Sequence, residues 1–283
     1  MSSYTTGQKK NYIIPLNSIL QHDKLGIEIV SESLQTKGYA YIKLPENIVQ
    51  EIDTCLKSIE LFFAKSKEQK KKYFKAPIFG YFDVDHKESF RVLTGSRIAE
   101  QEFPFELLGL KKFIHTIDQI MYSMTLSLSS QLFPNILNNA GKYDIPFFDM
   151  KNQWAMFDVA RYLNDGTRKE LNCKEHYDPG LLSLSLRSTE PGLQLKNEHG
   201  KWIKTPEDKT IAILWAGKAA TEINPKIKAG VHRVVNPIVS GKPRISMWHE
   251  ICTRAQEHRE LLGKNDGKKV DPYVVQSLSL IHI

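Results

Sequence analysis

The sequence predicts a mainly β protein with helices (α+β), in which a double-stranded β-helix, or jelly roll, follows a helical N-terminal region. Three observations indicate this fold class: helical periodicity in the first half, short strand-like runs separated by turns after Asn152, and alternation of leucine with serine in one of those runs. The 283 residues are enough for a large buried core. We divide them into an N-terminal region (1–150), a jelly-roll core (151–260) and a C-terminal tail (261–283).

Two long helices are predicted before the strands. From Pro45 to about Tyr73, apolar residues recur at the spacing of an amphipathic helix, with a proline in the first turn. The same spacing from Leu107 to Phe133 predicts a longer helix that packs against a sheet. The side chains that we expect in the core are Val49, Ile52, Leu56, Ile59 and Phe63 from the first helix and Leu110, Phe113, Ile114, Ile117, Ile120, Met121 and Met124 from the second.

The second half of the chain has the pattern of short strands. Residues 175–188 (EHYDPGLLSLSLRS) alternate leucine with serine after a proline-glycine bend. Residues 231–237 and 243–250 are two further strand-like runs, and the turn residues 240–243 (SGKP) between them predict a hairpin. Three side chains share one face of its second arm, namely Arg244, Ser246 and Trp248.

A metal site is predicted where these strands begin. His176 and Asp178 are two positions apart, so on a strand both side chains point to one face and can bind the same ion. His232 adds a second imidazole. Two histidines and one carboxylate form the facial triad that holds Fe(II) and leaves positions open for oxygen and an organic ligand. We therefore predict that these three residues are the metal ligands and the catalytic centre of an oxygen-activating iron enzyme.

A carboxylate site is predicted after the second histidine. Arg244 supplies a permanent cation, and Ser246 supplies a hydroxyl on the same face. An Fe(II) ion bound by two neutral imidazoles and one carboxylate keeps one net positive charge, which attracts an anionic co-substrate. The two residues would bind the carboxylate of such a molecule.

Two other His-x-Glu pairs could imitate the metal motif. His86 with Glu88 and His258 with Glu260 both lie in charged stretches without strand alternation. We expect both pairs on the solvated surface.

At these residues the chain resembles the isopenicillin N synthase-like branch of the iron- and 2-oxoglutarate-dependent oxygenases. The resemblance covers most of the chain and is best in residues 176–186 (HYDPGLLSLSL), 231–237 (VHRVVNP) and 242–246 (KPRIS). It implies a jelly roll that binds Fe(II) and uses 2-oxoglutarate and O2 as co-substrates. The reaction it implies is hydroxylation or desaturation of a small molecule, with release of succinate and CO2. By the same resemblance, Arg244, Ser246 and Tyr162 bind the far carboxylate of 2-oxoglutarate.

One departure from the family leaves alternatives open. Many 2-oxoglutarate users have Asn-x-Tyr where this chain has Ala160-Arg161-Tyr162, so the asparagine is missing. The Arg-Tyr pair is closer to isopenicillin N synthase itself, which needs no 2-oxoglutarate. An iron oxidase independent of 2-oxoglutarate is the main alternative. A zinc hydrolase and a non-catalytic ligand-binding protein on the same scaffold are the others.

Side chains around the motif are assigned to packing. We expect Leu182, Leu184, Leu195 and Ile245 to line the barrel, and Trp154 and Trp248 to be buried in the core. Cys173 precedes His176 by three positions, and we interpret it as a small buried residue.

Composition limits the partners and the location. The formal charge is +7, and six lysines lie in residues 65–75 (KSKEQKKKYFK), which we interpret as a solvated helix end rather than a nucleic-acid site. The three cysteines, Cys55, Cys173 and Cys252, match no disulfide framework or zinc motif. Residues 1–12 (MSSYTTGQKKNY) lack the apolar core that a signal peptide needs, and no apolar run reaches about 18 residues. We expect a cytoplasmic enzyme with a small-molecule substrate and no nucleic-acid or membrane partner.

Overall fold

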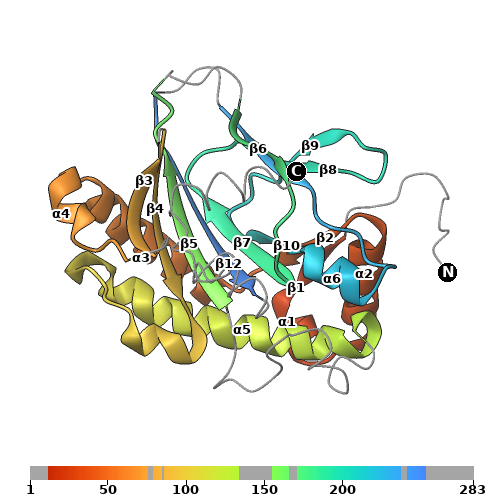
Figure 1. Ribbon diagram of the computed structural model, residues 1–283. Helices are drawn as coiled ribbons and strands as arrows, with labels where there is room; N and C mark the ends of the chain where they lie inside the picture. The colour runs from red at the N-terminus through yellow and green to blue at the C-terminus, as the bar shows by residue number, and fades with distance from the viewer. Residues whose placement is uncertain are drawn as a thin grey trace, which may run out of the picture.

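Among the described residues, most helices lie in the first half of the chain together with four strands, and the other eight strands lie in the second half (Figure 1). The computed structural model describes residues 12–75, 79–84, 86–133, 155–165, 171–236 and 241–252. The α-helices are α1 (Leu16–Leu20), α2 (Lys24–Thr36), α3 (Glu46–Phe63), α4 (Lys67–Lys71), α5 (Leu108–Leu132) and α6 (Lys218–Ile223), with 3-10 turns η1 (Gly95–Glu100) and η2 (Phe105–Leu107).

The first predicted helix is divided in two. Helix α3 begins after Pro45 and ends at Phe63, and its five predicted core residues are all buried. The chain then starts α4 at Ser66, whose side chain accepts a hydrogen bond from the backbone N–H of Gln69 while the Gln69 side chain bonds back to Ser66. This capping box begins a new helix because it binds N–H groups that no earlier turn can bond. The prediction of one helix as far as Tyr73 was therefore wrong.

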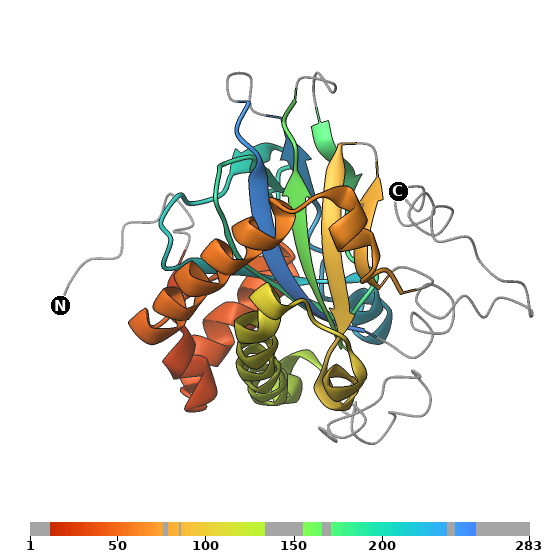
Figure 2. The same cartoon turned by 90° about the vertical axis from the view of Figure 1, so that its left-hand side faces the viewer.

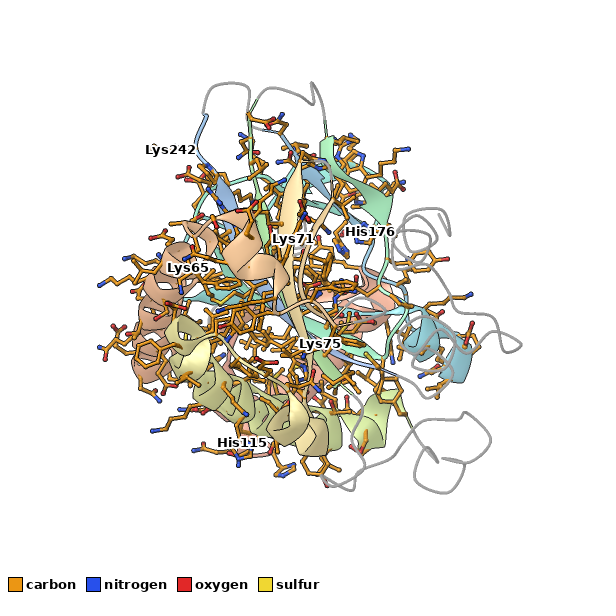
Figure 3. The ribbon with its side chains drawn as sticks, turned by 60° about the vertical axis from the view of Figure 1, so that its left-hand side comes forward. Lys65, Lys71, Lys75, His115, His176 and Lys242 are labelled. Atoms are coloured by element: carbon orange, nitrogen blue, oxygen red, sulfur yellow. The ribbon has the colours of Figure 1, made fainter. Side chains whose placement is uncertain are left out.

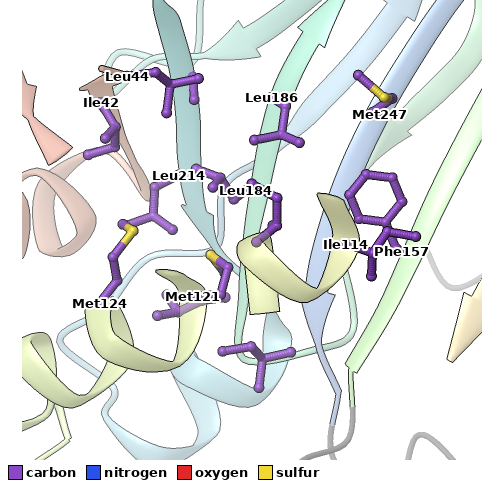
Figure 4. Close-up of a cluster of buried hydrophobic side chains, with 14 of the residues drawn as sticks. Ile42, Leu44, Ile114, Met121, Met124, Phe157, Leu184, Leu186, Leu214 and Met247 are labelled. Carbon is purple, nitrogen blue, oxygen red and sulfur yellow. The ribbon is translucent and has the colours of Figure 1, made fainter. Parts of the chain in front are cut away.

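Helix α5 matches the second predicted helix within one residue at each end. Of its predicted core residues, Ile120 is partly buried and the other six are buried. Its apolar side packs on the large sheet, where Met121 and Met124 lie beside Leu184 and Leu214 (Figure 4).

An eight-stranded sheet forms the base of the candidate site. Its order is β1-β2-β10-β7-β12-β5-β4-β3, and only β1 and β2 pair in parallel. The strands are β1 (Ile13–Pro15), β2 (Tyr39–Lys43), β3 (Gly80–Val84), β4 (Lys87–Leu93), β5 (Ala155–Tyr162), β7 (Leu182–Ser188), β10 (Ile211–Ala216) and β12 (Arg244–Ile251).

A four-stranded sheet faces it. This smaller sheet has the order β6-β11-β8-β9, from β6 (Leu171–His176), β8 (Leu193–Lys196), β9 (Trp202–Lys204) and β11 (His232–Val235). The predicted hairpin between residues 231–237 and 243–250 was wrong, although both strands exist. Strand β11 pairs with β6 and β8, whereas β12 pairs with β5 and β7 of the large sheet. The chain crosses between sheets there, as the jelly roll requires.

The two faces of the large sheet have different partners. Helices α1, α2, α3 and α5 cover one face and form the main core with it, and the small sheet lies on the other side (Figures 1 and 2). Leu182, Leu184 and Ile245 belong to the helix-covered core, so the expectation that they line the barrel was wrong for these three. Leu195 packs between the sheets with Tyr39, Tyr41, Ile213 and Trp215, as expected.

The proposed domain boundary at residue 150 stays a prediction. Strands β1 to β4 come from the N-terminal region yet belong to the same sheet as the C-terminal strands, and residues 134–154 and the tail 261–283 lie outside the described residues. Among the described helices, none combines the length and apolar character needed to span a membrane.

Candidate metal and carboxylate site

The three predicted metal ligands meet in the small sheet and its connection to β7. His176 is the last residue of β6 and His232 the first of β11, and the two are directly paired. Their Nε2 atoms lie 3.9 and 3.7 Å from Oδ1 of Asp178. One ligand atom from each residue falls within 4.8 Å of the others. Asp178 follows the end of β6 rather than lying on it, which corrects the prediction that both ligands share a strand.

A second contact orients each ligand. Nδ1 of His176 is 2.8 Å from the carbonyl oxygen of Lys174, and Nδ1 of His232 is 2.9 Å from that of Gly230. Since a carbonyl only accepts, both Nδ1 atoms carry a proton, and Nε2 of each ring is the atom that can bind a metal once it is unprotonated. The carboxylate is oriented in the same way, because its Oδ2 accepts from Ser183 Oγ at 2.5 Å and from Trp215 Nε1 at 2.6 Å.

Burial and mutual interaction change the pKa of each ligand. Burial raises the pKa of Asp178, but the two histidines, Ser183 and Trp215 outweigh it and hold that pKa below its usual value. Burial lowers the pKa of His176, yet Cys173 and Asp178 raise it to a net value of about 9. Burial and His176 together lower the pKa of His232 to about 4. A metal that binds here meets an ionised carboxylate and one neutral imidazole, and releases a proton from the other.

The donor set fits a divalent iron. Asp178 and His232 are buried, and the side chain of His176 is 20% exposed. Three donors oriented from one side, two nitrogens and one oxygen, leave the opposite side free for other ligands, as in iron oxygenases. Figure 3 shows His176 beside the strands, in the upper part of the molecule, whereas His115 of α5 lies at the outer surface below.

The predicted carboxylate site lies on the inner face of the large sheet. Arg244 pairs with Tyr162 and Ser246 with Ala160 across β12 and β5, so their side chains share a face. Arg244 is 2% exposed, and its guanidinium carbon lies 5.8 Å from the centre of the Tyr162 ring. Its Nε donates to the carbonyl oxygen of Glu190 at 3.1 Å. Among the described residues, no carboxylate lies within ion-pair distance of Arg244.

The two halves of the site are joined by apolar contacts between the sheets. Val234 of β11 and Cys173 of β6 pack in one cluster with Ala160, Tyr162 and Trp248 of the large sheet. Cys173 Sγ is also 3.7 Å from Nδ1 of His176. Cys173 is therefore half-buried beside the site rather than fully buried, and Trp248 faces the space between the sheets rather than the helix-covered core. Trp154 lies outside the described residues.

Arg161 does not belong to the site. It points to the other face of β5, where it donates to Glu88 Oε2 at 2.8 Å and to the carbonyl oxygen of Phe63 at 3.1 Å. Only Tyr162 of the Arg-Tyr pair faces the site.

Two surface assignments were wrong. His86 is buried, donates from Nε2 to the carbonyl oxygen of Asn172 at 2.8 Å, and stacks on Tyr162. Glu88 binds Lys70 Nζ at 2.5 Å in a buried ion pair, so one of the six lysines in residues 65–75 is not solvated. Lys65, Lys67 and Lys75 lie in more exposed ion pairs, and His258 with Glu260 lies outside the described residues.

The residues that orient Asp178 were not predicted from the sequence. Trp215 and Ser183 come from β10 and β7, and nothing in their local sequence refers to Asp178. The alternation of residues 182–188 predicted strand β7 but not the contact of Ser183 with Asp178. Alternation shows which side chains lie on the same face of a strand, and it does not show which residues of other elements they contact.

Comparisons with known proteins agree with this geometry. Residues 156–253 match the model of the 2OG-Fe(II) oxygenase superfamily. A comparison with curated proteins found no match.

Solved structures of low sequence identity share the fold. A full-length Neurospora crassa protein, in complex with alpha-KG and 5-formyluracil, is 19% identical with a TM-score of 0.69, over 98% of this chain and 99% of that one. The 2-oxoglutarate complex of dioxygenase for auxin oxidation 1 from Arabidopsis thaliana is 14% identical with a TM-score of 0.69, over 86% and 93% of the two chains. The rice dioxygenase for auxin oxidation is 13% identical with a TM-score of 0.68, over 86% and 83%.

The family match spans β5, the triad and the Arg-x-Ser pair. The fold and the site thus define a non-haem iron oxygenase with a jelly-roll core. The match of residues 156–253 to the 2OG-Fe(II) oxygenase superfamily, together with the His-Asp-His group inside it, supports an iron(II)- and 2-oxoglutarate-dependent dioxygenase with O2 as the second co-substrate.

Proposed function

We propose that this dioxygenase hydroxylates or desaturates a small molecule, with release of succinate and CO2. In this proposal His176, Asp178 and His232 bind Fe(II), and Arg244, Ser246 and Tyr162 bind 2-oxoglutarate. The observation that carries the second assignment is the buried guanidinium of Arg244. Arg244 has no carboxylate partner in the part of the chain that the structure describes; a buried cation of this kind is costly, and an anionic ligand would supply the missing charge.

The protein side chains have distinct tasks in this reaction. Bound Fe(II) supplies oxygen activation coupled to oxidative decarboxylation of 2-oxoglutarate. Arg244 offers a planar pair of N–H donors to the far carboxylate, and the hydroxyl of Ser246 adds a further hydrogen bond. The aromatic rings of Trp215, Tyr162 and Trp248 exclude water from the space between the two sheets.

The small size of the substrate is supported by the fold relatives. The Neurospora crassa protein has been solved with thymine as well as with 5-formyluracil, and two other relatives are dioxygenases for auxin oxidation. The lysine-rich segment 65–75 lies around α4, beside β3 and the outer end of α3 (Figures 1 and 3), and it includes several ion pairs of its own. A small substrate that enters between the sheets fits these observations.

An anaerobic titration tests the co-substrate. Fe(II) is added to the purified chain with and without 2-oxoglutarate, and visible absorption is recorded. We expect a metal-to-ligand charge-transfer band only when both are present, because 2-oxoglutarate must chelate the metal to produce it. Fe(II) binding without such a band, together with O2 consumption that needs no 2-oxoglutarate, would contradict the assignment of Arg244, Ser246 and Tyr162.

A further inference from the structure

A buried carboxylate next to the candidate site has one oxygen without a partner. Asp158 lies on β5, four residues before Tyr162, and is fully buried. Nε and Nη2 of Arg91 both donate to its Oδ2, the former at 2.7 Å. Oδ1 has no hydrogen-bond partner among the described residues. An unmade hydrogen bond at a buried charged oxygen costs free energy, so this atom is suited to a donor that arrives with a ligand.

A second unpartnered group lies on the neighbouring strand. Ser89 of β4 is fully buried, and its Oγ likewise lacks a partner in the part of the chain that the structure describes. Ser89 pairs with Ala160, and Arg91 pairs with Asp158, so all four side chains share one face of the sheet. The side chain of Ala160, which lies directly across from Ser89, has no polar atom that could bond to the Ser89 hydroxyl.

This face is continuous with the metal site. Across β5 and β12, Asp158 pairs with Trp248, Ala160 with Ser246, and Tyr162 with Arg244. Trp248 packs in the cluster that contains Val234, two residues after His232, and Cys173, three residues before His176. Lys87, next but one to Ser89, interacts electrostatically with both Asp158 and Cys173. Asp158 and Ser89 therefore lie on the face that carries Arg244 and Ser246, displaced along it toward Arg91.

The charges around Asp158 decide what kind of donor fits. Arg91 already neutralises its carboxylate, and Arg244 adds positive charge to the same face. This positive charge would repel a substrate ammonium group but not a neutral N–H. The hydroxyl of Ser89 supplies a donor for an oxygen next to that N–H. Trp248 offers a flat aromatic surface on the same face.

We propose that Asp158, held in place by Arg91, and Ser89 are the substrate-recognition residues of this enzyme, and that the substrate carries a neutral –NH–C(=O)– edge, as in a lactam or a cyclic imide. The N–H donates to Oδ1 of Asp158, and the carbonyl oxygen accepts from Ser89. The inference rests on the proposed function, because it places the substrate beside the triad and the 2-oxoglutarate site.

The test measures binding rather than turnover. The full chain is loaded with Fe(II) and 2-oxoglutarate under argon, and three N–H compounds are titrated by calorimetry against their N-methyl counterparts. The pairs are thymine and 1,3-dimethylthymine, uracil and 1,3-dimethyluracil, and 2-pyrrolidinone and N-methyl-2-pyrrolidinone. A hydrogen bond to a charged group corresponds to about 10- to 150-fold in affinity. We expect at least one N–H compound to bind more tightly than its methylated partner by a factor in that range.

Variants then assign the effect to residues. Asp158→Asn can place an amide NH2 where Oδ1 stands, so the preference for the N–H compound should be lost. Ser89→Ala should weaken binding of the same compound by about tenfold without changing the preference for N–H. The control is Asp53→Asn, which breaks the partly exposed Arg187–Asp53 ion pair on the helix-covered side. It should change neither the affinity for the N–H compound nor the preference over its methylated partner.

The outcomes separate this inference from the proposed function. If no N–H compound binds better than its methylated partner, or if Asp158→Asn keeps the preference, the recognition role is wrong even though the 2-oxoglutarate band is intact. If the wild-type chain gives no band, the proposed function fails on its own. If Asp158→Asn does not fold, the compound pairs on the wild-type chain and the Ser89→Ala variant still show whether the recognition role is right.

Discussion

Each metal ligand in this protein is oriented by a hydrogen bond to a second group of the protein. The imidazoles are turned by the carbonyl groups of Lys174 and Gly230, and the carboxylate by Ser183 and Trp215. Partners of this kind fix the tautomer and direction of a ligand, and their loss commonly costs about 10- to 100-fold in metal affinity. The site is thus oriented for a metal by protein contacts alone.

Removal of any single ligand should abolish tight Fe(II) binding. We expect His176→Ala, Asp178→Ala and His232→Ala each to lose the metal while keeping the fold, because a three-ligand site has no ligand to spare. Iron content and circular dichroism of the purified variants measure the two properties. His199→Ala, which changes an exposed histidine, is the matched control and should bind iron like the wild type. Full iron occupancy in one of the first three variants would exclude that residue from the triad.

The Arg244→Lys variant tests whether binding of the 2-oxoglutarate carboxylate needs the geometry of the guanidinium or only its positive charge. Arg244→Lys keeps a cation but loses the two parallel N–H donors, so we expect 2-oxoglutarate binding to weaken much more than iron binding. Loss of one partner of a buried charged pair costs about 2–5 kcal/mol, or roughly 30- to 5,000-fold in affinity. Lysine should fall near the low end and alanine near the high end, while Ser246→Ala should cost about 1–3 kcal/mol. The charge-transfer band, titrated with 2-oxoglutarate, reports each affinity; equal affinity in Arg244→Lys and wild type would contradict the assignment.

At the scale of elements, helix α5 is joined to the sheet by buried polar contacts as well as by apolar packing. Asp118 accepts hydrogen bonds from Thr94 Oγ1 at 2.5 Å and from the backbone N–H of Gly95 at 2.8 Å. Its Oδ1 is also 2.6 Å from Nε2 of His249 on β12. Asp118 and His249 are both fully buried, and the cluster connects α5, β12 and the turn after β4.

Asp118→Ala should therefore be strongly destabilising. It leaves buried groups of Thr94, Gly95 and His249 unpaired, and removal of one partner from a buried pair costs about 3–5 kcal/mol. Asp118→Asn keeps an acceptor and should cost less. Urea unfolding followed by circular dichroism measures both variants, with Glu28→Ala in the exposed Lys24–Glu28 pair as a control that should stay within about 0.5 kcal/mol of wild type. A loss of under about 1 kcal/mol in Asp118→Ala would show that the cluster is not needed for stability.

Periodicity predicted the elements better than it predicted their partners. The apolar spacing in α3 and α5 located both helices, because burial of one helix face is a local property of the sequence. Strands β11 and β12 were also found, but a turn-rich segment between them was interpreted as a hairpin, whereas it crosses from one sheet to the other. Lys70 and His86 show the same limit at single residues, since their partners, Glu88 and Asn172, are brought to them only by the folded sheet. The triad itself was predictable because its spacing and residue types are set by the metal.

At the scale of the whole molecule, the two ligand sites join the two sheets. His176 and His232 belong to the small sheet, whereas Arg244 and Ser246 belong to the large one. A 2-oxoglutarate molecule that chelates the metal and binds Arg244 would connect them. The unfolded chain has no such arrangement, so binding should stabilise the folded state by mass action.

Thermal unfolding should therefore respond to the two ligands in a defined order. At about 100 times its dissociation constant, a ligand that binds only the folded state adds about 2.7 kcal/mol, or roughly 5–10 °C in Tm for a chain of this size. We expect Fe(II) alone to raise the Tm under argon and 2-oxoglutarate to raise it further only when the metal is present. In Asp178→Ala both increments should vanish, because the metal is lost. In Arg244→Lys, at the ligand concentrations used for the wild type, the Tm increase from Fe(II) should remain and the increase from 2-oxoglutarate should be smaller. A 2-oxoglutarate increment that survives in Asp178→Ala would mean that the molecule binds without the metal, and that the two sites are not joined through it.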